Sequence, residues 1–435
     1  MGKTKPFVHS PMAYGLWPLA CILMNVLFLT VSRITDINVR GIYTDLMRRF
    51  RDEGHNVHIV SPLERRLKQK TQYIEKDGIK LLNVRTFNIQ KTNLIEKGIG
   101  TILLAYQFHQ AIQKHLQNIK FDLIIYSTPP ITTTKVVRFI KKRDGAKTYL
   151  LLKDIFPQNA VDLGMIKKDG ILHRYFRRKE KKLYKVSDYI GCMSQANVKY
   201  VIRHNPEINP DVIETNPNSI EPVRKTIQPE EKMQARIKYD IPTAATVLIY
   251  GGNLGKPQGI DFLISVLMAN DRKQDRFFII VGSGTEFPKI QKWFERNQPK
   301  NARLLFGLPK DEYDQLVQSC DVGMIFLDQR FTIPNFPSRL LSYLEFEMPV
   351  IAGTDRNTDL GKIIEENNFG LWAESGDLDK MNQHIDYLCQ HADARQIMGA
   401  NGYSYLLGHY TTKHSYEIIM NHFKRNAQTS QISAM

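Results

Sequence analysis

Cysteine is scarce in this chain of 435 residues, which contains only four. Cys21, Cys192, Cys320 and Cys389 lie far apart, and no two of them form a CxxC pair. Disulfide frameworks and zinc sites need cysteines at short, paired spacings, so the sequence argues against both and fits a reducing compartment. No metal motif such as DxD stands at a recognisable site either, and we predict neither a metal nor another cofactor.

The usual signatures of phosphate and nucleic-acid binding are also missing. The glycine-rich stretch Gly251–Asp261 (GGNLGKPQGID) follows the apolar run Thr246–Tyr250. It lacks the GK[ST] ending of a Walker loop and the GxGxxG spacing of dinucleotide-binding proteins. No nucleic-acid motif is recognisable, and the aromatic residues do not alternate with basic clusters in a stacking pattern. A nucleic-acid-binding protein is therefore only an alternative interpretation, supported by charge alone.

Basic residues are abundant, with a formal net charge of +16 and an isoelectric point near 9.5. This balance suits an acidic partner such as nucleic acid, anionic lipid or a phosphorylated ligand. Most basic clusters lie in the first half, for example Arg48–Arg51 and Lys167–Lys185. At 42% apolar and 24% charged residues the composition is that of a globular protein. The length exceeds what one hydrophobic core usually organises, so we expect two domains.

The N-terminal segment permits two interpretations. Residues 14–31 are almost free of charge and approach the length that spans a bilayer, which suits a membrane anchor. We favour the other interpretation, in which Val26–Val31 (VLFLTV) is a buried strand followed by a helix at Ile42–Arg51 and a strand at His55–Val60. Residues 1–23 are then an N-terminal extension, either not native or disordered.

Strand and helix patterns alternate in two runs along the rest of the chain. In the first run we expect further strands and helices at 79–84, 99–119, 121–126, 132–142, 148–152, 171–186 and 189–193. The Pro- and Asn-rich stretch Asn205–Glu221 predicts a linker. In the second run we expect strands at 247–250, 276–281, 302–306, 322–326, 350–352 and 370–372. The alternation predicts an α/β fold with two doubly wound Rossmann-like domains facing across a cleft.

Ligands of such sheets bind at the carboxyl ends of the strands, where loops lead into helices. In the second run these loops are Gly251–Asp261, Gly282–Gly284 and Asp328–Ser338, the last ending just before a helical run. Backbone N–H groups at a helix N-terminus favour anions, and Lys256 and Arg339 add positive charge there. The sequence therefore predicts a diphosphate site at this edge of the second sheet.

The order of these motifs resembles the family-4 glycosyltransferases of GT-B fold. In the second half the resemblance is carried by GGNLGKPQGID (251–261), VGSGTE (281–286), FGLPKDEYDQLVQSCDVGMIFL (306–327) and PSRLLSYLEFEMPVIAG (337–353). In the first half it is carried by the stretch 26–62, by LLKDIFPQNAVDLGMI (151–166) and by NPNSIEP (216–222). The chain is similar to the branch of this family that transfers N-acetyl-L-fucosamine or related deoxy-amino sugars in O-antigen or capsule assembly.

The resemblance implies a retaining transferase of the hexosyltransferase type that moves a sugar from a nucleotide-sugar, with UDP favoured, to a polyprenyl-diphosphate-linked or oligosaccharide acceptor in cell-surface polysaccharide synthesis. It implies a cytoplasmic protein associated peripherally with the inner face of the cytoplasmic membrane. It divides the chain into an acceptor-binding domain (24–220), a nucleotide-sugar-binding domain (221–410), a helix crossing back to the first domain (411–425) and a flexible tail (426–435). A nucleotide-sugar 2-epimerase of the same fold is the alternative.

The resemblance also assigns the donor contacts. Two basic positions of the family, in the first loop of the second domain, fall on Asn253 and Gln258. Two glutamate positions separated by seven residues fall on Pro334 and Ser342, and Glu345 lies nearby but out of register. The full set of expected contacts is Gly41, Gly252, Asn253, Gly255, Lys256, Gln258, Gly282, Leu308, Asn335, Ser338, Arg339 and Ser342.

A retaining transferase of this family needs few protein side chains, because a phosphate oxygen of the donor can take the proton of the acceptor. The favoured side-chain base is Asp154, which follows a buried strand in LLKDIFP and should face the cleft. The alternative role for this carboxylate is a helix cap or an ion pair, for example with Lys153. His55, His109 and His173 are weaker candidates for the base.

The basic stretch Lys167–Lys185 bears on the acceptor. One face of this predicted helix is apolar and comprises Leu172, Tyr175, Phe176, Leu183 and Tyr184. A basic amphipathic helix can lie on an anionic membrane surface, where each basic residue adds about 1 kcal/mol. We expect the apolar face to pack on the sheet and the basic face to meet lipid.

Overall fold

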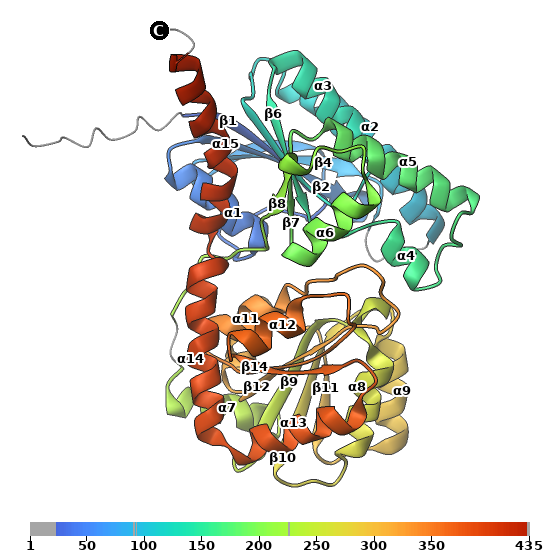
Figure 1. Cartoon of the computed structure of the whole chain (residues 1–435), viewed down its shortest axis with the longest axis vertical. Helices are drawn as coiled ribbons and strands as arrows, with labels where there is room; N and C mark the ends of the chain where they lie inside the picture. Colours follow the sequence, from blue (N-terminus) through green and yellow to red (C-terminus); the bar gives the residue numbers. More distant parts are fainter. Residues whose placement is uncertain (1–22, 90–91, 93, 225–226, 433–435) are drawn as a thin grey trace, which may run out of the picture.

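The computed structural model describes residues 23–89, 92, 94–224 and 227–432, and it consists of two α/β domains stacked along the long axis of the molecule (Figure 1). The first domain is built on an eight-stranded sheet and the second on a six-stranded sheet. Both sheets are doubly wound, and their domains face one another as the alternation of strands and helices predicted.

The first sheet has the strand order β3-β4-β2-β1-β5-β6-β7-β8, and every neighbouring pair is parallel except β3 and β4. Its strands are β1 (Asn25–Leu29), β2 (Asn56–Glu64), β3 (Gln72–Lys76), β4 (Ile79–Thr86), β5 (Leu123–Ser127), β6 (Lys147–Leu152), β7 (Tyr189–Cys192) and β8 (Ile213–Thr215). The helices of this domain are α1 (Ile42–Asp52), α2 (Leu94–His115), α3 (Thr134–Asp144), α4 (Gln158–Asp162), α5 (Ile171–Val186) and α6 (Gln195–His204).

The second sheet has the order β11-β10-β9-β12-β13-β14, and all its pairs are parallel. Its strands are β9 (Thr246–Asn253), β10 (Arg276–Ser283), β11 (Ala302–Phe306), β12 (Val322–Phe326), β13 (Val350–Thr354) and β14 (Gly370–Glu374). The helices are α7 (Pro229–Lys238), α8 (Ile260–Ala269), α9 (Phe287–Asn297), α10 (Lys310–Gln318), α11 (Arg339–Glu345), α12 (Leu360–Glu366), α13 (Leu378–Gln390) and α14 (Ala392–His409).

The central strand β1 feeds two separate cores. Leu27 and Leu29 join the cluster on one face of the sheet, and Val26 and Phe28 join the cluster on the other. A parallel strand buried on both faces must be apolar at every position, which explains the continuous run in the sequence. The strand interpretation of this run is therefore confirmed, although the strand ends at Leu29. Residues 1–22, which carry most of the predicted extension, lie outside the described residues.

Two strands and two helices of the first domain were not predicted. β3 is a polar, largely exposed edge strand, so it lacks the apolar run that marks a buried one. β8 has only three residues and lies inside the stretch that we interpreted as a linker. It pairs with β7, so the chain leaves the first sheet only after Thr215. The two helices that were not predicted are the short helix α4 and helix α6.

Helix α5 departs from its predicted packing. Leu183 and Tyr184 are buried in the core, but Leu172 and Tyr175, assigned to the same inward face, are exposed. In Figure 1 the N-terminal end of α5 lies at the outer edge of the first domain. Phe176 of the predicted face packs against the core, so the amphipathic prediction holds from Phe176 onwards and fails before it.

The last two helices connect the domains. Helix α14 packs against α11 of the second domain, and α15 (Thr412–Ile432) packs against α1 of the first (Figure 1). Tyr416, Ile419 and Met420 of α15 join the first-domain core. The helix continues to Ile432, although residues 426–435 were predicted to be flexible; residues 433–435 lie outside the described part. Within the described chain, we find no helix with the length and apolar character needed to cross a bilayer.

Candidate active site

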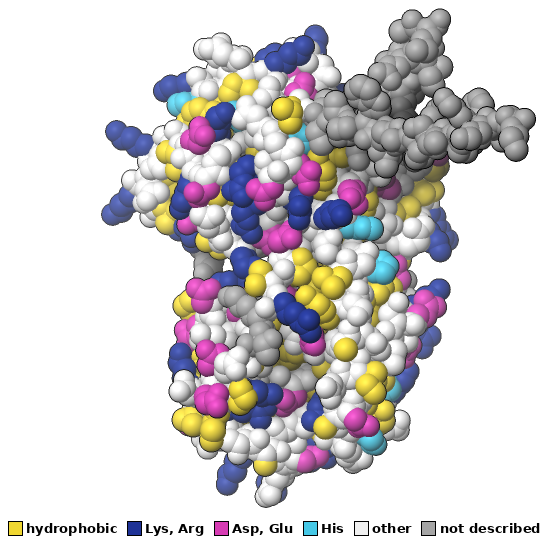
Figure 2. All heavy atoms as spheres, turned by 90° about the vertical axis from the view of Figure 1, so that its left-hand side faces the viewer, with side chains coloured by type: hydrophobic (Ala, Val, Ile, Leu, Met, Phe, Trp, Pro, Cys, Tyr) yellow, Lys and Arg dark blue, Asp and Glu magenta, His cyan; other side chains and the backbone are white. Residues whose placement is uncertain are grey.

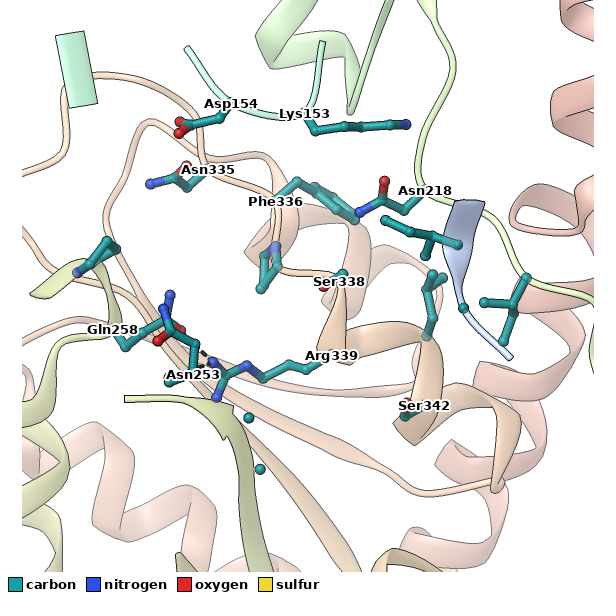
Figure 3. A pocket seen from close by; sticks show the side chains of 18 of the residues that line it. Lys153, Asp154, Asn218, Asn253, Gln258, Asn335, Phe336, Ser338, Arg339 and Ser342 are labelled. Carbon is teal, nitrogen blue, oxygen red and sulfur yellow. Dashed lines mark hydrogen bonds between the residues drawn. The ribbon is translucent and has the colours of Figure 1, made fainter. Parts of the chain in front are cut away.

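A cavity of about 620 Å³ lies between the two domains, at the carboxyl ends of both sheets. Its first-domain wall comes from the loops after β1, β5 and β6, and its second-domain wall comes from the loops after β9 and β12 and from α11 (Figure 3). Parallel sheets collect their connecting loops at these ends, which is why residues far apart in the chain meet here.

Two glycines at the end of β9 allow its backbone to form part of the cavity wall. A Cβ at Gly251 would lie 2.1 Å from the hydroxyl oxygen of Tyr313, so no larger residue fits there. Gly252 has a φ of 114°, which other residues rarely adopt. Gly282 has a supporting role, because a Cβ there would lie 1.8 Å from the carbonyl oxygen of Gly252. The absence of a side chain at Gly282 therefore lets β10 pair closely with β9 beside the cavity wall.

Arg339 supplies a cation to the second-domain wall. Its guanidinium lies over the ring of Tyr250, 4.1 Å from the ring centroid. One terminal nitrogen, Nη2, donates to Gln258 Oε1 at 2.5 Å and to the carbonyl oxygen of Asn253 at 3.3 Å (Figure 3). The other nitrogen, Nη1, is buried and has no hydrogen-bond partner within the described residues. Arg339 as a whole lines the cavity, so its positive charge lies beside any ligand bound there.

Most of the predicted donor contacts lie in the cavity wall, and four do not. The lining includes Gly41, Gly252, Asn253, Gln258, Asn335, Ser338, Arg339 and Ser342. The residues that do not line it are Gly255, Lys256, Gly282 and Leu308. The prediction that Lys256 shares a site with Arg339 is wrong for this cavity. A tight turn at Lys256–Gln258 places Gln258 in the wall and Lys256 in a separate hollow of about 200 Å³ beside Asp261 and Glu286.

Asp154 lies in the first-domain wall, as expected from its place after β6. Its half-buried carboxylate accepts a hydrogen bond of 2.6 Å from Nδ2 of Asn159. Burial raises the pKa of Asp154 to about 6, against the opposing effect of the Asn159 amide. Its own backbone N–H and that of Lys153 donate to Thr128 Oγ1, which fixes the loop. The expected alternative, an ion pair with Lys153, is not formed.

None of the three candidate histidines lines the cavity. His55 is buried and holds the chain together, because Nδ1 accepts from the N–H of Met24 at 3.2 Å and Nε2 lies 2.9 Å from the Tyr416 hydroxyl. His109 packs edge-on against an aromatic ring of α3. His173 accepts from the backbone N–H of Asp169. Their roles are structural, since packing and not sequence position determines which histidines face a cleft.

Lys153 is a cavity residue that the sequence did not assign to ligand binding. In Figure 3 its side chain extends away from Asp154 along the first-domain wall. The ammonium donates to the carbonyl oxygen of Asn216 at 3.3 Å. Burial lowers the pKa of Lys153 to about 7. A low-pKa lysine in a cleft is typical of functional sites.

An ion pair closes the cavity at the side where the chain crosses between the domains. Arg40, in the loop after β1, pairs with Glu345 at the end of α11. Glu345 is buried and also accepts from the backbone N–H of Val223 in the crossing segment. This carboxylate, out of register with the family's glutamates, therefore joins the domains. No group of three or more potential metal ligands occurs within the described residues.

The charge on the outer surface is mixed. Figure 2 shows the face that lies to the left in Figure 1, where Lys and Arg side chains are interspersed with Asp and Glu. The described part of this face has no continuous basic track, which nucleic-acid binding would require. The excess of basic residues is therefore not concentrated on this face of the molecule.

Two families match successive parts of the chain. Residues 42–224 match Glycosyltransferase Family 4, and residues 231–405 match Glycosyl transferases group 1. The boundary between the matches falls between the two sheets of the structure. Each match thus corresponds to one of the two α/β domains.

Relatives with glycosyltransferase names align with much of the chain. WbjE of Pseudomonas aeruginosa, named as a glycosyltransferase, is 23% identical over 310 residues, which are 69% of this chain and 74% of that protein. WcaI of Escherichia coli (strain K12), named for colanic acid biosynthesis, is 25% identical over 255 residues, 57% of this chain and 60% of that protein.

A solved structure shares the arrangement of the two domains. Anabaena HepE in complex with UDP and glucose aligns with a TM-score of 0.67 at 13% identity, covering 92% of this chain and 100% of that chain. At this identity the likeness concerns the fold. Together with the two family matches, it identifies the chain as a glycosyltransferase of GT-B fold, with a Family 4 domain followed by a group 1 domain.

Proposed function

We propose that this glycosyltransferase moves a sugar from a UDP-sugar to a polyprenyl-diphosphate-linked or oligosaccharide acceptor in cell-surface polysaccharide synthesis, with retention at the transferred carbon. N-acetyl-L-fucosamine or a related deoxy-amino sugar is the proposed cargo, on the strength of the motif order. The observation that carries the UDP proposal is the guanidinium of Arg339 in the wall of the cavity between the domains, beside Gly252 and Asn253.

A diphosphate suits the surroundings of Arg339. Arginine presents paired N–H donors that match phosphate oxygens. Gly252 and Asn253 are exposed beside it, so a phosphate can approach the backbone closely. A phosphate beside the Arg339 guanidinium would be stabilised by its positive charge. The first-domain loop with Gly41 faces this position across the cavity.

The chemical step needs stabilisation of the leaving group and acceptance of one proton. As the bond between the sugar carbon and the β-phosphate oxygen breaks, the acceptor oxygen forms a new bond to that carbon, and UDP leaves with the bonding electron pair. Arg339 would stabilise the negative charge that develops on the diphosphate. The acceptor proton passes to a leaving phosphate oxygen on the same face, or to Asp154. We assign Asp154 to the acceptor side because it lies in the first-domain wall.

The names of relatives support the setting. WcaI is named for colanic acid biosynthesis and HepE was solved with UDP and glucose. The 2-epimerase alternative needs a histidine at the cleft, and none of the described histidines lines the cavity. The transferase proposal is therefore preferred over the epimerase.

We also propose that the first domain meets an anionic membrane surface, at the cytoplasmic face where a polyprenyl-linked acceptor is accessible. The connection from α4 to α5 exposes Met165 (58%), Ile171 (81%) and Leu172 (60%). Lys167 and Lys168 lie between these apolar residues and are exposed too. Apolar side chains flanked by cations are typical of segments that bind the interface of anionic bilayers. This surface replaces the longer amphipathic face that the sequence predicted.

The test of the donor class is calorimetric titration of the full chain with UDP, GDP and ADP at fixed salt. We expect UDP to bind most tightly and Arg339→Ala to weaken it about 10- to 100-fold, the value of a charge-assisted hydrogen bond. Arg339→Lys should give an intermediate loss. Lys256→Ala is the matched control, because this cation lies outside the cavity, and should change UDP affinity by less than about twofold.

Two results would contradict this proposal. Tighter binding of GDP or ADP would refute the UDP assignment while leaving the fold intact. An equal loss of affinity in Arg339→Ala and Lys256→Ala would show that general positive charge, and not the geometry at Arg339, holds the nucleotide.

A further inference from the structure

Lys153 occupies the first-domain wall of the cavity and is not used by the chemistry described so far. It follows β6 directly, so the last residues of a central buried strand fix its backbone. Its side chain runs past Asn218, while that of Asp154 points the other way (Figure 3). Both residues line the cavity, but their side chains run in opposite directions, and the ammonium of Lys153 lies next to the buried Asn216.

The ammonium of Lys153 has no countercharge within the described chain. It donates to the carbonyl oxygen of Asn216 at 3.3 Å, and no carboxylate among the described residues lies within ion-pair distance. The carboxylates that line the same cavity are already engaged. Asp45 accepts from Arg48, Asp154 accepts from Asn159, and Glu345 pairs with Arg40.

Two titratable side chains near Lys153, Tyr43 and Cys192, are neutral. Tyr43 of α1 lines the same wall, and burial raises its pKa. Cys192 of β7 lies near the ammonium, and burial raises its pKa to about 12. Burial disfavours a charged amine with such neighbours, which lowers the pKa of Lys153 to about 7. An oxyanion bound at this place would supply the missing charge and reverse that effect.

We propose that Lys153 binds an oxyanion, a carboxylate or a phosphate group, of the ligand that occupies the first-domain half of the cavity, so that the enzyme prefers an acidic ligand there. This inference rests on the proposed transferase function and names a property of its substrate. The oxyanion has two sources in that reaction: a carboxylate on the donor sugar, or the diphosphate that links the acceptor to its polyprenyl chain.

The proposal has a measurable proton linkage. With a pKa of about 7, Lys153 in the free enzyme is about one-quarter protonated at pH 7.5. A bound oxyanion raises this pKa, so that nearly every Lys153 side chain becomes protonated in the complex. Binding of an acidic ligand at pH 7.5 should therefore take up about 0.7 of a proton. A neutral ligand should take up much less, since it brings no countercharge to Lys153.

The experiment is calorimetry of the full chain at pH 7.5 in two buffers of different ionisation enthalpy. One arm compares UDP-glucuronate with UDP-glucose, which tests a carboxylate on the donor. The other arm titrates farnesyl diphosphate and farnesol, which tests an acceptor diphosphate. UDP alone is the reference ligand. We expect one acidic probe to bind at least about tenfold more tightly than its neutral partner, with proton uptake.

Two variants separate binding from structure. Lys153→Met keeps the length of the apolar stem and should remove both the preference and the proton uptake. Lys153→Arg stays charged at all accessible pH values, so it should keep the preference but lose the uptake. A merely structural lysine would not produce this split. The thermal midpoint of Lys153→Met should not fall, because the variant no longer buries an amine.

Three possible results bear on the Lys153 inference or on the proposed donor. If neither acidic probe shows a preference that depends on Lys153, the inference is overturned. If Lys153→Met weakens UDP as much as the acidic probes, the lysine acts on the fold and the inference is again overturned. If UDP itself does not bind, the proposed donor is wrong, and the farnesyl diphosphate arm still decides whether Lys153 is an oxyanion site.

Discussion

Three charged side chains of the cavity differ in how they are neutralised. Arg339 has one buried nitrogen without a partner among the described residues, Lys153 donates to a carbonyl oxygen, and Asp154 accepts from an amide. Electrostatic interactions strengthen where water is excluded, so incompletely satisfied charges are the places where ligand groups gain most. The two cations lie on opposite walls, and each is suited to a different part of a charged substrate.

The pKa of Asp154 leads to a prediction about pH dependence. Burial raises this pKa to about 6, so the carboxylate loses its basic form as the pH falls through about 6. If Asp154 takes the acceptor proton, kcat/KM should rise with pH across that value. Asp154→Asn should lower kcat/KM at least about 100-fold and remove the limb near pH 6, which a pH series of initial rates would measure.

Asn159→Ala provides the control for this assignment. The amide of Asn159 stabilises the ionised carboxylate, so its removal should raise the pKa of Asp154 and move the acid limb to higher pH without abolishing transfer. An unchanged limb in Asp154→Asn would mean that another group accepts the proton, and a phosphate oxygen of the donor would then be the base.

Short elements determine which residues reach the cavity. The tight turn at Lys256–Gln258 separates two polar residues of one loop into different hollows. Helix α11 carries Arg339 and Ser342 on the cavity side and ends at Glu345, which joins the domains. Both elements are only a turn or two long, so a shift of one residue would change the set of side chains in the wall.

The connection from α4 to α5 is the element that we expect to meet the membrane. Lys167→Glu with Lys168→Glu should weaken binding to vesicles containing phosphatidylglycerol by at least about 30-fold, because each cation near such a surface contributes about 1 kcal/mol. Co-sedimentation with vesicles measures the effect, which should shrink at high salt.

The matched control reverses the same number of charges on the second domain. Lys292→Glu with Arg296→Glu changes two exposed residues of α9. This pair should leave vesicle binding nearly intact. Equal losses in both double variants would indicate that net charge alone, and not the surface near α5, drives association.

At the scale of the whole molecule, several contacts hold the domains together, including Asn197 Nδ2, which donates to the carbonyl oxygen of Pro334 at 2.7 Å. Two others involve residues in or next to the cavity wall. On the side of the chain crossing, Arg40 pairs with Glu345. On the other side, the carboxylate of Asp162 accepts from the backbone N–H of Thr332 at 2.8 Å and from its hydroxyl at 2.8 Å and 2.9 Å. Thr332 belongs to the loop that leads to Arg339, so closure and donor binding share one segment.

Removing the contact between Asp162 and Thr332 should open the cleft. Asp162→Ala should increase the radius of gyration in the absence of ligand, because hydrogen bonds to a charged group contribute about 1.5–3 kcal/mol. UDP should return the variant toward the wild-type value, and small-angle X-ray scattering measures both. Asp211→Ala, at an exposed site on the first domain, is the control. Scattering profiles that are identical with and without UDP would contradict ligand-linked closure.

Much of the sheet architecture could be predicted from the sequence. Strands such as β1 and β9 are continuous apolar runs because both of their faces are buried, and this signal is local. β3 and β8 were missed because an exposed edge strand and a three-residue strand carry no such signal. The exposed first turns of α5 were misassigned because periodicity shows which residues share a face, and not whether anything packs against it.

At the site, the residue types and the loops that carry them could be predicted from the amino-acid order. Gly252 and Asp154 follow strands and Arg339 begins a helix, and parallel sheets direct such loops and helix starts to one edge. Which of those residues share a cavity depends on how the two domains pack. Lys256 is excluded from the cavity by the three-residue turn at Lys256–Gln258, and Lys153 lies in its wall beside Asp154. The physical reason is that side-chain direction and countercharge depend on groups far away in the chain, which come together only when the domains pack.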